Sequence, residues 1–327
     1  MRAMAMFDAG QLLQPIARPI PVPGRGEVLL EVEACGVCRT DLHIVDGDLR
    51  RPHMPIIPGH EIVGRITALG AGVVGLSLGQ RVGVPWLGRT CGHCPYCASI
   101  RENLCDDPTF TGYTRDGGFA THTVADASFV FPLDDKAPAS ALAPLLCAGL
   151  IGWRSLKLAG DAPAIGLYGF GAAAHILTQI CVHQDRRVHA FTREGDGAAQ
   201  AFALSLGAVS AQSSASMSPE PLDAAILFAP IGGLVPIALR AVRKGGRVVC
   251  GGIHMTDIPS FPYRLLWGER QVLSVTNLTR GDGVECLALA SRIGVRTNSI
   301  PYRLEKANDA LADLRDGRLH GAAVLVP

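Results

Sequence analysis

The sequence predicts an α/β protein of two domains, with a mostly β first half and a doubly wound parallel sheet in the second half. With 327 residues, the chain is long enough for two domains. Up to about Ala148, short apolar runs are separated by Gly and Pro, which is typical of strands and turns. Beyond Ala148, apolar runs alternate with segments that favour helices, as in a doubly wound sheet.

Three strands are expected in the first half. They are GEVLLEVEACG (26–36), EIVGRITALG (61–70) and RVGVPWLG (81–88), with Gly and Pro between them. This half should therefore be mostly β.

In the second half, segments that favour strands alternate with segments that favour helices. Its strands are expected at 164–171, 186–192, 222–230 and 245–253, and its helices at 172–184 and 198–208. A helix at 306–317 and a final strand, AAVLVP, come after them, and that strand can return to the first half.

The stretch from Ala137 to Trp153 carries no charge and could be mistaken for a membrane span. It is too short to span a membrane, and it contains Pro138 and Pro144. A buried segment rich in small residues is expected there, with Cys147 in its middle.

The charge balance excludes two classes of partner. Thirty Lys and Arg face 29 Asp and Glu, for a net charge of +1, so neither nucleic acid nor an anionic membrane is expected as a partner. The N-terminal MRAMAMFDAG lacks the pattern of a signal peptide, which makes the cytoplasm the expected compartment. The ten cysteines are then expected to be reduced thiols, some of them holding metal.

Four cysteines gather in CGHCPYCASIRENLC, at positions 91, 94, 97 and 105. Cys91, Cys94, Cys97 and Cys105 can close a tetrahedral shell around zinc, leaving no open position, so a structural site is expected. Four thiolates also suit an iron–sulfur cluster, and a redox CxxC pair is a further alternative.

A second set of residues can hold a catalytic zinc, which needs three protein ligands and one open position. Cys38, His60 and Cys147 would supply two thiolates and an imidazole. Each residue alone has an ordinary explanation, either as a small core side chain or as a hydrogen-bonded histidine.

Three motifs together resemble the zinc-containing medium-chain alcohol dehydrogenases. GHEIVGRITALGAGV, beginning at Gly59, fits the GHExxGxxxxxGxxV signature of that family at every fixed position. GVCRTDLH fits the segment with its first zinc ligand, and the four-cysteine stretch fits its structural zinc loop. The resemblance runs nearly end to end and implies a GroES-like catalytic domain and a Rossmann-type cofactor domain.

The resemblance also implies a role for each matching residue. Cys38, His60 and Cys147 become the ligands of the catalytic zinc, with Glu61 close behind the metal. Asp41 matches the carboxylate that orients the histidine ligand.

A proton relay is implied by the same segment. Thr40 matches the hydroxyl that contacts the reacting alcohol, and His43 matches the histidine that passes its proton to solvent. Arg39 matches a base that faces the cofactor pyrophosphate. The ordinary alternatives are a helix cap for Thr40 and exposed polar residues for His43 and Arg39.

The second half carries a candidate dinucleotide site. In AIGLYGFGAAAH, Gly169, Gly171 and Ala174 form a GxGxxA pattern between an expected strand and an expected helix. Thr192 stands where an NAD enzyme usually presents an acid, and Arg193 follows it. This pair favours the 2′-phosphate of NADP, while Glu194 keeps NAD as an alternative.

Substrate-pocket positions depart from ethanol-using relatives. Trp86 matches an aromatic wall, but Leu49 replaces a tryptophan often found in those relatives, so an alcohol or aldehyde larger than ethanol is expected. Ile151 stands where many relatives carry a threonine near the nicotinamide, which removes one polar contact there.

The resulting prediction is an alcohol dehydrogenase or aldehyde reductase that uses zinc and NADP(H) or NAD(H), and assembles as a homodimer or homotetramer. Residues 1–148, completed by 286–327, would form the catalytic domain, and residues 149–285 the cofactor domain. A polyol or sugar dehydrogenase and a non-catalytic zinc- and dinucleotide-binding relative are the alternatives.

Overall fold

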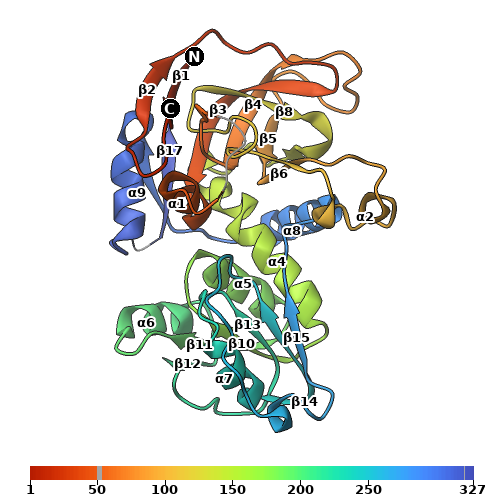
Figure 1. Cartoon of the computed structure of the whole chain (residues 1–327), viewed down its shortest axis with the longest axis vertical. Helices are drawn as coiled ribbons and strands as arrows, with labels where there is room; N and C mark the ends of the chain where they lie inside the picture. The colour runs from red at the N-terminus through yellow and green to blue at the C-terminus, as the bar shows by residue number, and fades with distance from the viewer. Residues whose placement is uncertain (50–53, 320) are drawn as a thin grey trace. The chain divides into compact units, whose positions relative to one another are not determined.

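The computed structural model describes residues 1–49, 54–319 and 321–327 and divides the chain into two compact units (Figure 1). The first unit contains Met1–Cys147, Asn277–Leu287 and Arg296–Pro327. The second unit contains Ala148–Thr276 and Ala288–Val295.

The first unit is built on a seven-stranded sheet, which agrees with the expected mostly β half. Six of its strands follow the order β16-β17-β3-β4-β5-β9, and β8 pairs with β3 outside that path. All pairs are antiparallel except β16 with β17. The bounds are β3 Glu27–Val37, β4 Glu61–Leu69, β5 Arg81–Val84, β8 His122–Asp126, β9 Phe131–Pro132, β16 Ser299–Arg303 and β17 Ala322–Val326.

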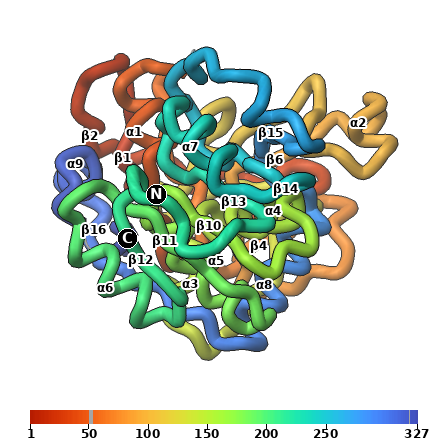
Figure 2. Tube along the Cα trace, turned by 90° about the horizontal axis from the view of Figure 1, so that it is seen from below, coloured from red at the N-terminus to blue at the C-terminus, as the bar shows by residue number. Residues whose placement is uncertain are grey.

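The C-terminal strand does return to the first half. In β17, residues Ala323 to Leu325 pair with Val37 to Cys35 of β3. The ends of the chain lie near each other in both views (Figures 1 and 2), and Arg2 and Pro327 line one shallow pocket.

The third expected strand, 81–88, is interrupted. It divides into β5 and β6 (Leu87–Arg89), because Pro85 has no N–H to continue the ladder. Strand β6 turns away to pair with β7 (Thr109–Phe110), and the two frame the segment that carries the four cysteines. A second hairpin, β1 (Arg2–Ala5) with β2 (Gln14–Ala17), was not expected from the sequence.

Short helices cover the first unit. They are α1 Arg39–Asp46, α2 Pro95–Ala98, α3 Ala139–Leu142 and α9 Ala307–Arg315, with 3-10 turns η1 Glu102–Leu104, η2 Ala127–Phe129, η3 Ala143–Leu146 and η5 Leu304–Lys306. Helix α9 packs against α1 and β17. Helix α2 projects as a lobe in both views (Figures 1 and 2).

The second unit is a six-stranded sheet in which every pair is parallel, as expected. Its order is β12-β11-β10-β13-β14-β15, the arrangement of a doubly wound dinucleotide-binding sheet. The bounds are β10 Ala164–Tyr168, β11 Arg187–Thr192, β12 Ser210–Ser213, β13 Leu222–Leu227, β14 Val242–Cys250 and β15 Gln271–Ser274.

Helices connect these strands. They are α4 Ala148–Ala159, α5 Ala172–His183, α6 Gly197–Ser205 and α7 Leu234–Ala241, together with the 3-10 turn η4 Tyr263–Leu265. Helix α6 packs on β11 and β12, and α7 packs on β13 and β14. The central strands β10 and β13 are almost completely buried, which explains their continuous apolar sequences.

Helix α8 (Arg280–Ile293) contributes residues to both units. Its beginning belongs to the first unit: Leu278 is buried, and the Arg280 N–H donates to Glu102 Oε1 at 2.9 Å. The chain therefore rejoins the first unit from Asn277, before residue 286, where the sequence placed the return.

No single helix within the described residues is long and apolar enough to cross a membrane. The uncharged segment forms α3, η3 and the start of α4, and only the bent pair Ala139–Leu146 with Ala148–Ala159 has a sufficient length of apolar sequence.

Candidate functional site

Four side chains from three separate parts of the first unit meet in one cluster. Cys38 follows β3 and caps α1, His60 and Glu61 stand at the start of β4, and Cys147 follows η3. The potential ligand atoms of all four residues lie within 4.8 Å of one another. The structure thus brings together the three predicted ligands and the predicted carboxylate.

Asp41 ties two of these segments together. Its Oδ2 accepts from the Cys38 N–H at 2.9 Å, and its Oδ1 accepts from the Gly59 N–H at 3.2 Å. The same Oδ1 lies 3.2 Å from His60 Nδ1, although the two atoms are not aligned for a hydrogen bond. His60 Nε2 consequently faces the cluster, 3.0 Å from Cys38 Sγ.

The pKa values of the two thiols in the cluster are shifted in opposite directions. A hydrogen bond from Cys147, helped by the charge of His60, lowers the pKa of Cys38 well below its ordinary value. The hydrogen bond to Cys38 and burial raise the pKa of Cys147. Burial opposes the protonation of His60, but the neighbouring charges of Cys38 and Asp41 outweigh it and raise the pKa of that imidazole.

Glu61 is almost fully buried and faces the same cluster. Burial and the charge of Cys38 raise its pKa well above the ordinary value. Gly36, its register partner on β3, makes the room, because a Cβ there would lie within 2.7 Å of the Glu61 carboxyl carbon.

The donor set fits zinc. Two thiols, one imidazole and one carboxylate are ordinary zinc ligands, and Asp41 supplies the carboxylate that usually supports a metal-bound histidine. Burial and the charge of Cys38 raise the pKa of Glu61, and the hydrogen bond to Cys38 and burial raise that of Cys147, so both anions are unfavourable without a counter-charge. A divalent cation would stabilise them as anions.

An aromatic stack lies against the cluster. The Trp86 ring meets His60 edge-on, with centroids 5.0 Å apart and an interplanar angle of 78°. Phe110 and Tyr113 stack on Trp86, at 5.1 and 5.7 Å. Trp86, predicted as an aromatic wall of the substrate pocket, is therefore part of a stack of three aromatic rings.

The predicted relay residues lie on α1. Thr40 and His43 are three positions apart and so share one face of the helix. The Thr40 N–H donates to Cys38 Sγ at 3.3 Å, and His43 Nδ1 lies 2.7 Å from Asp48 Oδ2. Arg39, the first residue of α1, is exposed.

The four-cysteine segment forms a second cluster. The sulfurs of Cys91, Cys94, Cys97 and Cys105 also lie within 4.8 Å of one another. Backbone N–H groups point at them: Cys94 donates to Cys91 Sγ at 3.3 Å, and Asp107 donates to Cys105 Sγ at 3.4 Å. This pattern fits a metal held by four thiolates, zinc among them.

The thiols of this lobe also differ in proton affinity. Backbone N–H groups of Cys97 and Asp106 lower the pKa of Cys94 to about 6, and burial raises that of Cys105 to about 12. The lobe is attached to the body of the unit through Glu102, whose carboxylate accepts from Arg280. Burial opposes this charge, but Arg280 lowers the pKa of Glu102 below its ordinary value.

In the second unit, the glycine pattern lies where the sequence placed it, between β10 and α5. Gly169 has φ +90°, and a Cβ there would lie 2.7 Å from the Ala229 nitrogen, so only glycine fits. Gly171 caps α5, nothing lies within 4 Å of the Cβ position at this glycine, and Ala174 is fully buried in the helix. The open helix N-terminus suits a pyrophosphate.

Thr192 and Arg193, at the end of β11, have different surroundings. The buried Thr192 hydroxyl donates to the Arg193 carbonyl at 3.1 Å and accepts from Gln200 at 3.0 Å. The Arg193 side chain is 88% exposed, and its Nη2 lies 3.7 Å from Asp196 Oδ2. Of this pair, Arg193 is the residue that faces solvent.

Sequence reasoning missed Asp48, Phe110 and Tyr113 as members of the site. Asp48 follows Gly47, which ends α1 in a left-handed conformation, and this turn brings Asp48 back to His43. The glycine in this position was the available signal. Nothing in the sequence marks the two aromatic residues as neighbours of Trp86.

A parallel dinucleotide-type sheet and a β unit with a buried thiolate–imidazole cluster define a nicotinamide-dependent oxidoreductase with a metal centre. Residues 24–135 match the model of the alcohol dehydrogenase GroES-like domain. "Probable alcohol dehydrogenase AdhA" of Mycobacterium tuberculosis (strain CDC 1551 / Oshkosh) is 46% identical, over 98% of this chain and 94% of its own length. An alcohol dehydrogenase of Moraxella sp. (strain TAE123) is 33% identical over 99% of each chain.

A solved structure of cinnamyl alcohol dehydrogenase SbCAD4 from Sorghum bicolor superposes with a TM-score of 0.90. It is 26% identical, and the match covers 99% of this chain and 97% of that one. The chain belongs to the zinc-containing medium-chain alcohol dehydrogenase family, and the resemblance inferred from its motifs is confirmed.

Proposed function

We propose that this protein is a zinc-dependent alcohol dehydrogenase that transfers hydride between a primary or small secondary alcohol and NADP(H), with NAD(H) as the weaker cofactor. The observation that carries the proposal is the buried cluster of Cys38, His60, Glu61 and Cys147, organised by Asp41 in a chain of this family.

In this proposal, Cys38, His60 and Cys147 hold the catalytic zinc, with Glu61 beside them. When bound, zinc supplies Lewis-acid chemistry to the oxygen of the alcohol or carbonyl compound. The protein fixes the ligands beforehand: the Asp41 carboxylate lies 3.2 Å from His60 Nδ1, and the Thr40 N–H donates to Cys38 Sγ.

The hydroxyl proton leaves along α1. Thr40 and His43 share a helix face, and the Asp48 carboxylate holds the His43 ring by its Nδ1. These residues provide a route for the proton that does not open the site to bulk water.

The preference for NADP rests on the end of β11. An uncharged Thr192 stands where an acid would repel a 2′-phosphate, and the exposed Arg193 guanidinium can bind one. Gly169, Gly171 and Ala174 would receive the pyrophosphate at the start of α5, with Arg39 as an additional base.

A flat, unsaturated alcohol is the substrate that we favour. Trp86, backed by Phe110 and Tyr113, presents a rigid aromatic surface beside His60, and Leu49 is smaller than an aromatic residue. The Sorghum bicolor relative is named for cinnamyl alcohol, which agrees with this choice.

We also propose that the protein works in the cytoplasm as a homodimer or homotetramer. All ten cysteines are free thiols, and reducing compartments preserve thiols for metal binding. Cell fractionation and light scattering would test these two points.

The main test is alcohol oxidation, followed by the nicotinamide absorbance band with NADP+ and with NAD+. We expect turnover on cinnamyl and benzyl alcohols, with a higher kcat/KM for NADP+. Zinc-loaded protein that oxidises no alcohol in an aliphatic and aromatic panel would contradict the proposal, and a preference for NAD+ would contradict the role of Arg193.

A further inference from the structure

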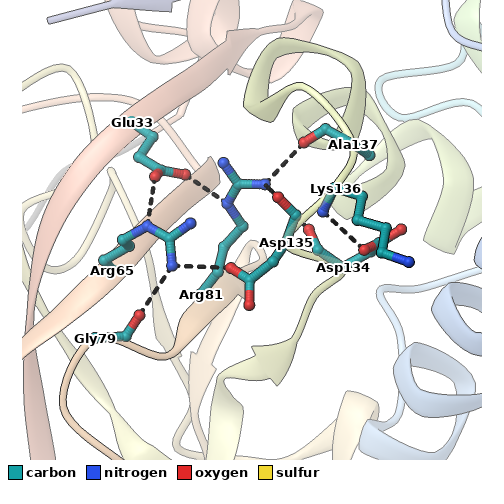
Figure 3. A network of polar contacts seen from close by, with 8 residues as sticks. All are labelled: Glu33, Arg65, Gly79, Arg81, Asp134, Asp135, Lys136 and Ala137. Atoms are coloured by element: carbon teal, nitrogen blue, oxygen red, sulfur yellow. Dashed lines mark hydrogen bonds and ion pairs between the residues drawn. The ribbon is translucent and has the colours of Figure 1, made fainter.

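Arg81, on β5, has a buried guanidinium with an unusual number of partners (Figure 3). Its side chain is 9% exposed, and its Nε lies 2.6 Å from Glu33 Oε2. Its Nη1 donates to the carbonyls of Asp134, Asp135 and Ala137, at 3.1, 3.2 and 2.7 Å. One side chain thus binds the Glu33 carboxylate of β3 and three backbone carbonyls of the loop that follows β9.

A second arginine completes the network. Arg65, the register partner of Arg81 on β4, binds the other oxygen of Glu33 at 2.9 Å. It also binds the Asp135 carboxylate at 2.8 Å and the Gly79 carbonyl at 2.9 Å. Two cations therefore face two carboxylates, and the charges balance within the network.

The loop held by Arg81 leads directly to the metal cluster. After Ala137 the chain forms α3 and η3, and the next residue is Cys147. Residues 143–146 of η3 are buried, so this turn is part of the core. The position of Cys147 therefore depends on how the segment that begins at Asp134 is fixed.

Strand β5 contacts this segment at both ends. Arg81 holds its beginning, and Gly83 packs at its end, where a Cβ would lie 2.5 Å from Leu146 Cδ2. One position further along the ladder from Gly83, Val84 pairs with Ile62, the residue next to Glu61. The paired strands β4 and β5 thus hold Glu61 in place, and β5 also contacts the segment that leads to Cys147.

We propose that Arg81, held by Glu33, is a positioning residue for Cys147, and thereby for the metal centre of the active site. The inference rests on the proposed function, because it takes Cys147 as a metal ligand. Only a planar guanidinium offers enough donors for the carboxylate and three carbonyls together. Lysine would keep the charge but lose the fork, and it could not hold the Glu33 carboxylate and all three carbonyls together.

The test measures metal binding rather than turnover. Arg81→Lys is compared with wild type and with Leu311→Val, a control on α9 that perturbs the same hydrophobic core away from the loop. Zinc affinity is obtained by competition with a chelator, and Co2+ loading reports thiolate ligation through its charge-transfer band.

We expect Arg81→Lys to weaken metal binding roughly tenfold at the site of Cys38, His60 and Cys147, in the range known for residues that orient ligands. The lobe should keep its own affinity, and the thiolate–cobalt band of the first site should weaken. Glu33→Gln should shift both readouts in the same direction by a smaller factor, and it carries the test if Arg81→Lys does not fold.

Unchanged affinity in both variants would overturn the inference. So would equal weakening at both metal sites, matching that of Leu311→Val, because general loss of stability would then explain it. Cys147→Ser distinguishes failure of the inference from failure of the proposed function. If that variant keeps the metal bound at Cys38 and His60, the proposed function fails along with the inference. If it loses the metal while the Arg81 and Glu33 variants keep it, only the inference fails.

Discussion

The two proposed metal sites of the first unit use similar side chains but are assembled in different ways. The lobe takes all four sulfurs from one short stretch, Cys91 to Cys105, on a projecting segment. The other cluster takes Cys38, His60 and Cys147 from three segments that the large sheet brings together.

The difference is one of loop closure. Joining residues that are close in sequence costs little chain entropy, so the lobe requires only its own turns. The distant cluster requires the correct register of β3, β4 and β5, and its geometry therefore depends on the whole unit. The lobe is expected to tolerate changes elsewhere, and the distant cluster is not.

The largest expected effect is that of Cys38→Ser. We expect kcat/KM to fall by about a thousandfold or more, because the Lewis acid contributes several kcal/mol to the transition state. Metal analysis should show one zinc lost and the lobe zinc kept. Cys250→Ser, in the second unit, is the matched control; loss of both metals in Cys38→Ser would contradict the independence of the sites.

Asp41→Asn should have the next largest effect. The amide has only one oxygen, so it cannot accept from the Cys38 and Gly59 N–H groups through separate oxygens, and it carries no charge beside His60. Zinc affinity at that cluster should therefore fall by about 10- to 100-fold. Chelator competition measures the change, and Asp46→Asn on the same helix serves as control. Equal weakening of the lobe would refute the comparison.

Arg193, in the second unit, should affect cofactor binding and neither metal site. Arg193→Ala should raise the KM for NADP+ by about tenfold, the effect of one lost charge-assisted hydrogen bond, and leave that for NAD+ unchanged. Both metals should stay bound. Steady-state kinetics with the two cofactors decide it, and equal changes for both would remove Arg193 from the 2′-phosphate site.

Cys97→Ser tests the lobe itself. It should remove the lobe metal and lower the melting temperature, since metal binding there contributes folding free energy. Because the other cluster is built elsewhere, kcat/KM at 25 °C should stay within about threefold of wild type. A fall as large as that of Cys38→Ser would show that the lobe controls the catalytic site.

The smallest effect concerns pH and involves neither metal. Hydrogen bonds from Arg187 and His189 lower the pKa of Glu220 to about 2, from an ordinary value of 4.5. The ionised form therefore stabilises the fold above about pH 4.5, and this contribution is lost as the pH falls toward 2.

Glu220→Gln isolates this contribution. Because the side chain is 34% exposed and solvent screens it, the difference in unfolding free energy from wild type should be at most about 1 kcal/mol. Urea titrations at several pH values should show this difference shrinking as the pH drops from 4.5. A difference that grows with acid would contradict the assignment.

The sequence predicted the parts of the molecule whose signals are local. Cysteine spacing located the lobe, glycine spacing located the turn before α5, and alternating segments indicated the parallel sheet. Residues whose roles depend on distant packing were not predictable in this way. Arg81 looks like an ordinary strand residue until the loop at 134–137 folds over it.

Two features differ from the sequence prediction: the break at Pro85, and the return of the chain to the first unit from Asn277 rather than from residue 286. The apolar run at 81–88 reads as one strand, but proline ends its ladder and β6 pairs elsewhere. Thr279 and Asp282 cap α8 reciprocally, and Glu102 receives the Arg280 N–H. The contact with Glu102, a residue far away in the sequence, joins that helix start to the first unit.

The pairing of β17 with β3 has a consequence for the order of folding. Strand β3 ends at Val37, directly before Cys38, and its partner Ala323 lies 286 residues later in the sequence. The lobe can form from contacts within one short stretch, whereas the strand beside Cys38 gains this neighbour only when two remote parts of the chain meet. We therefore expect the surroundings of Cys38 to be completed late in folding, after the lobe has formed.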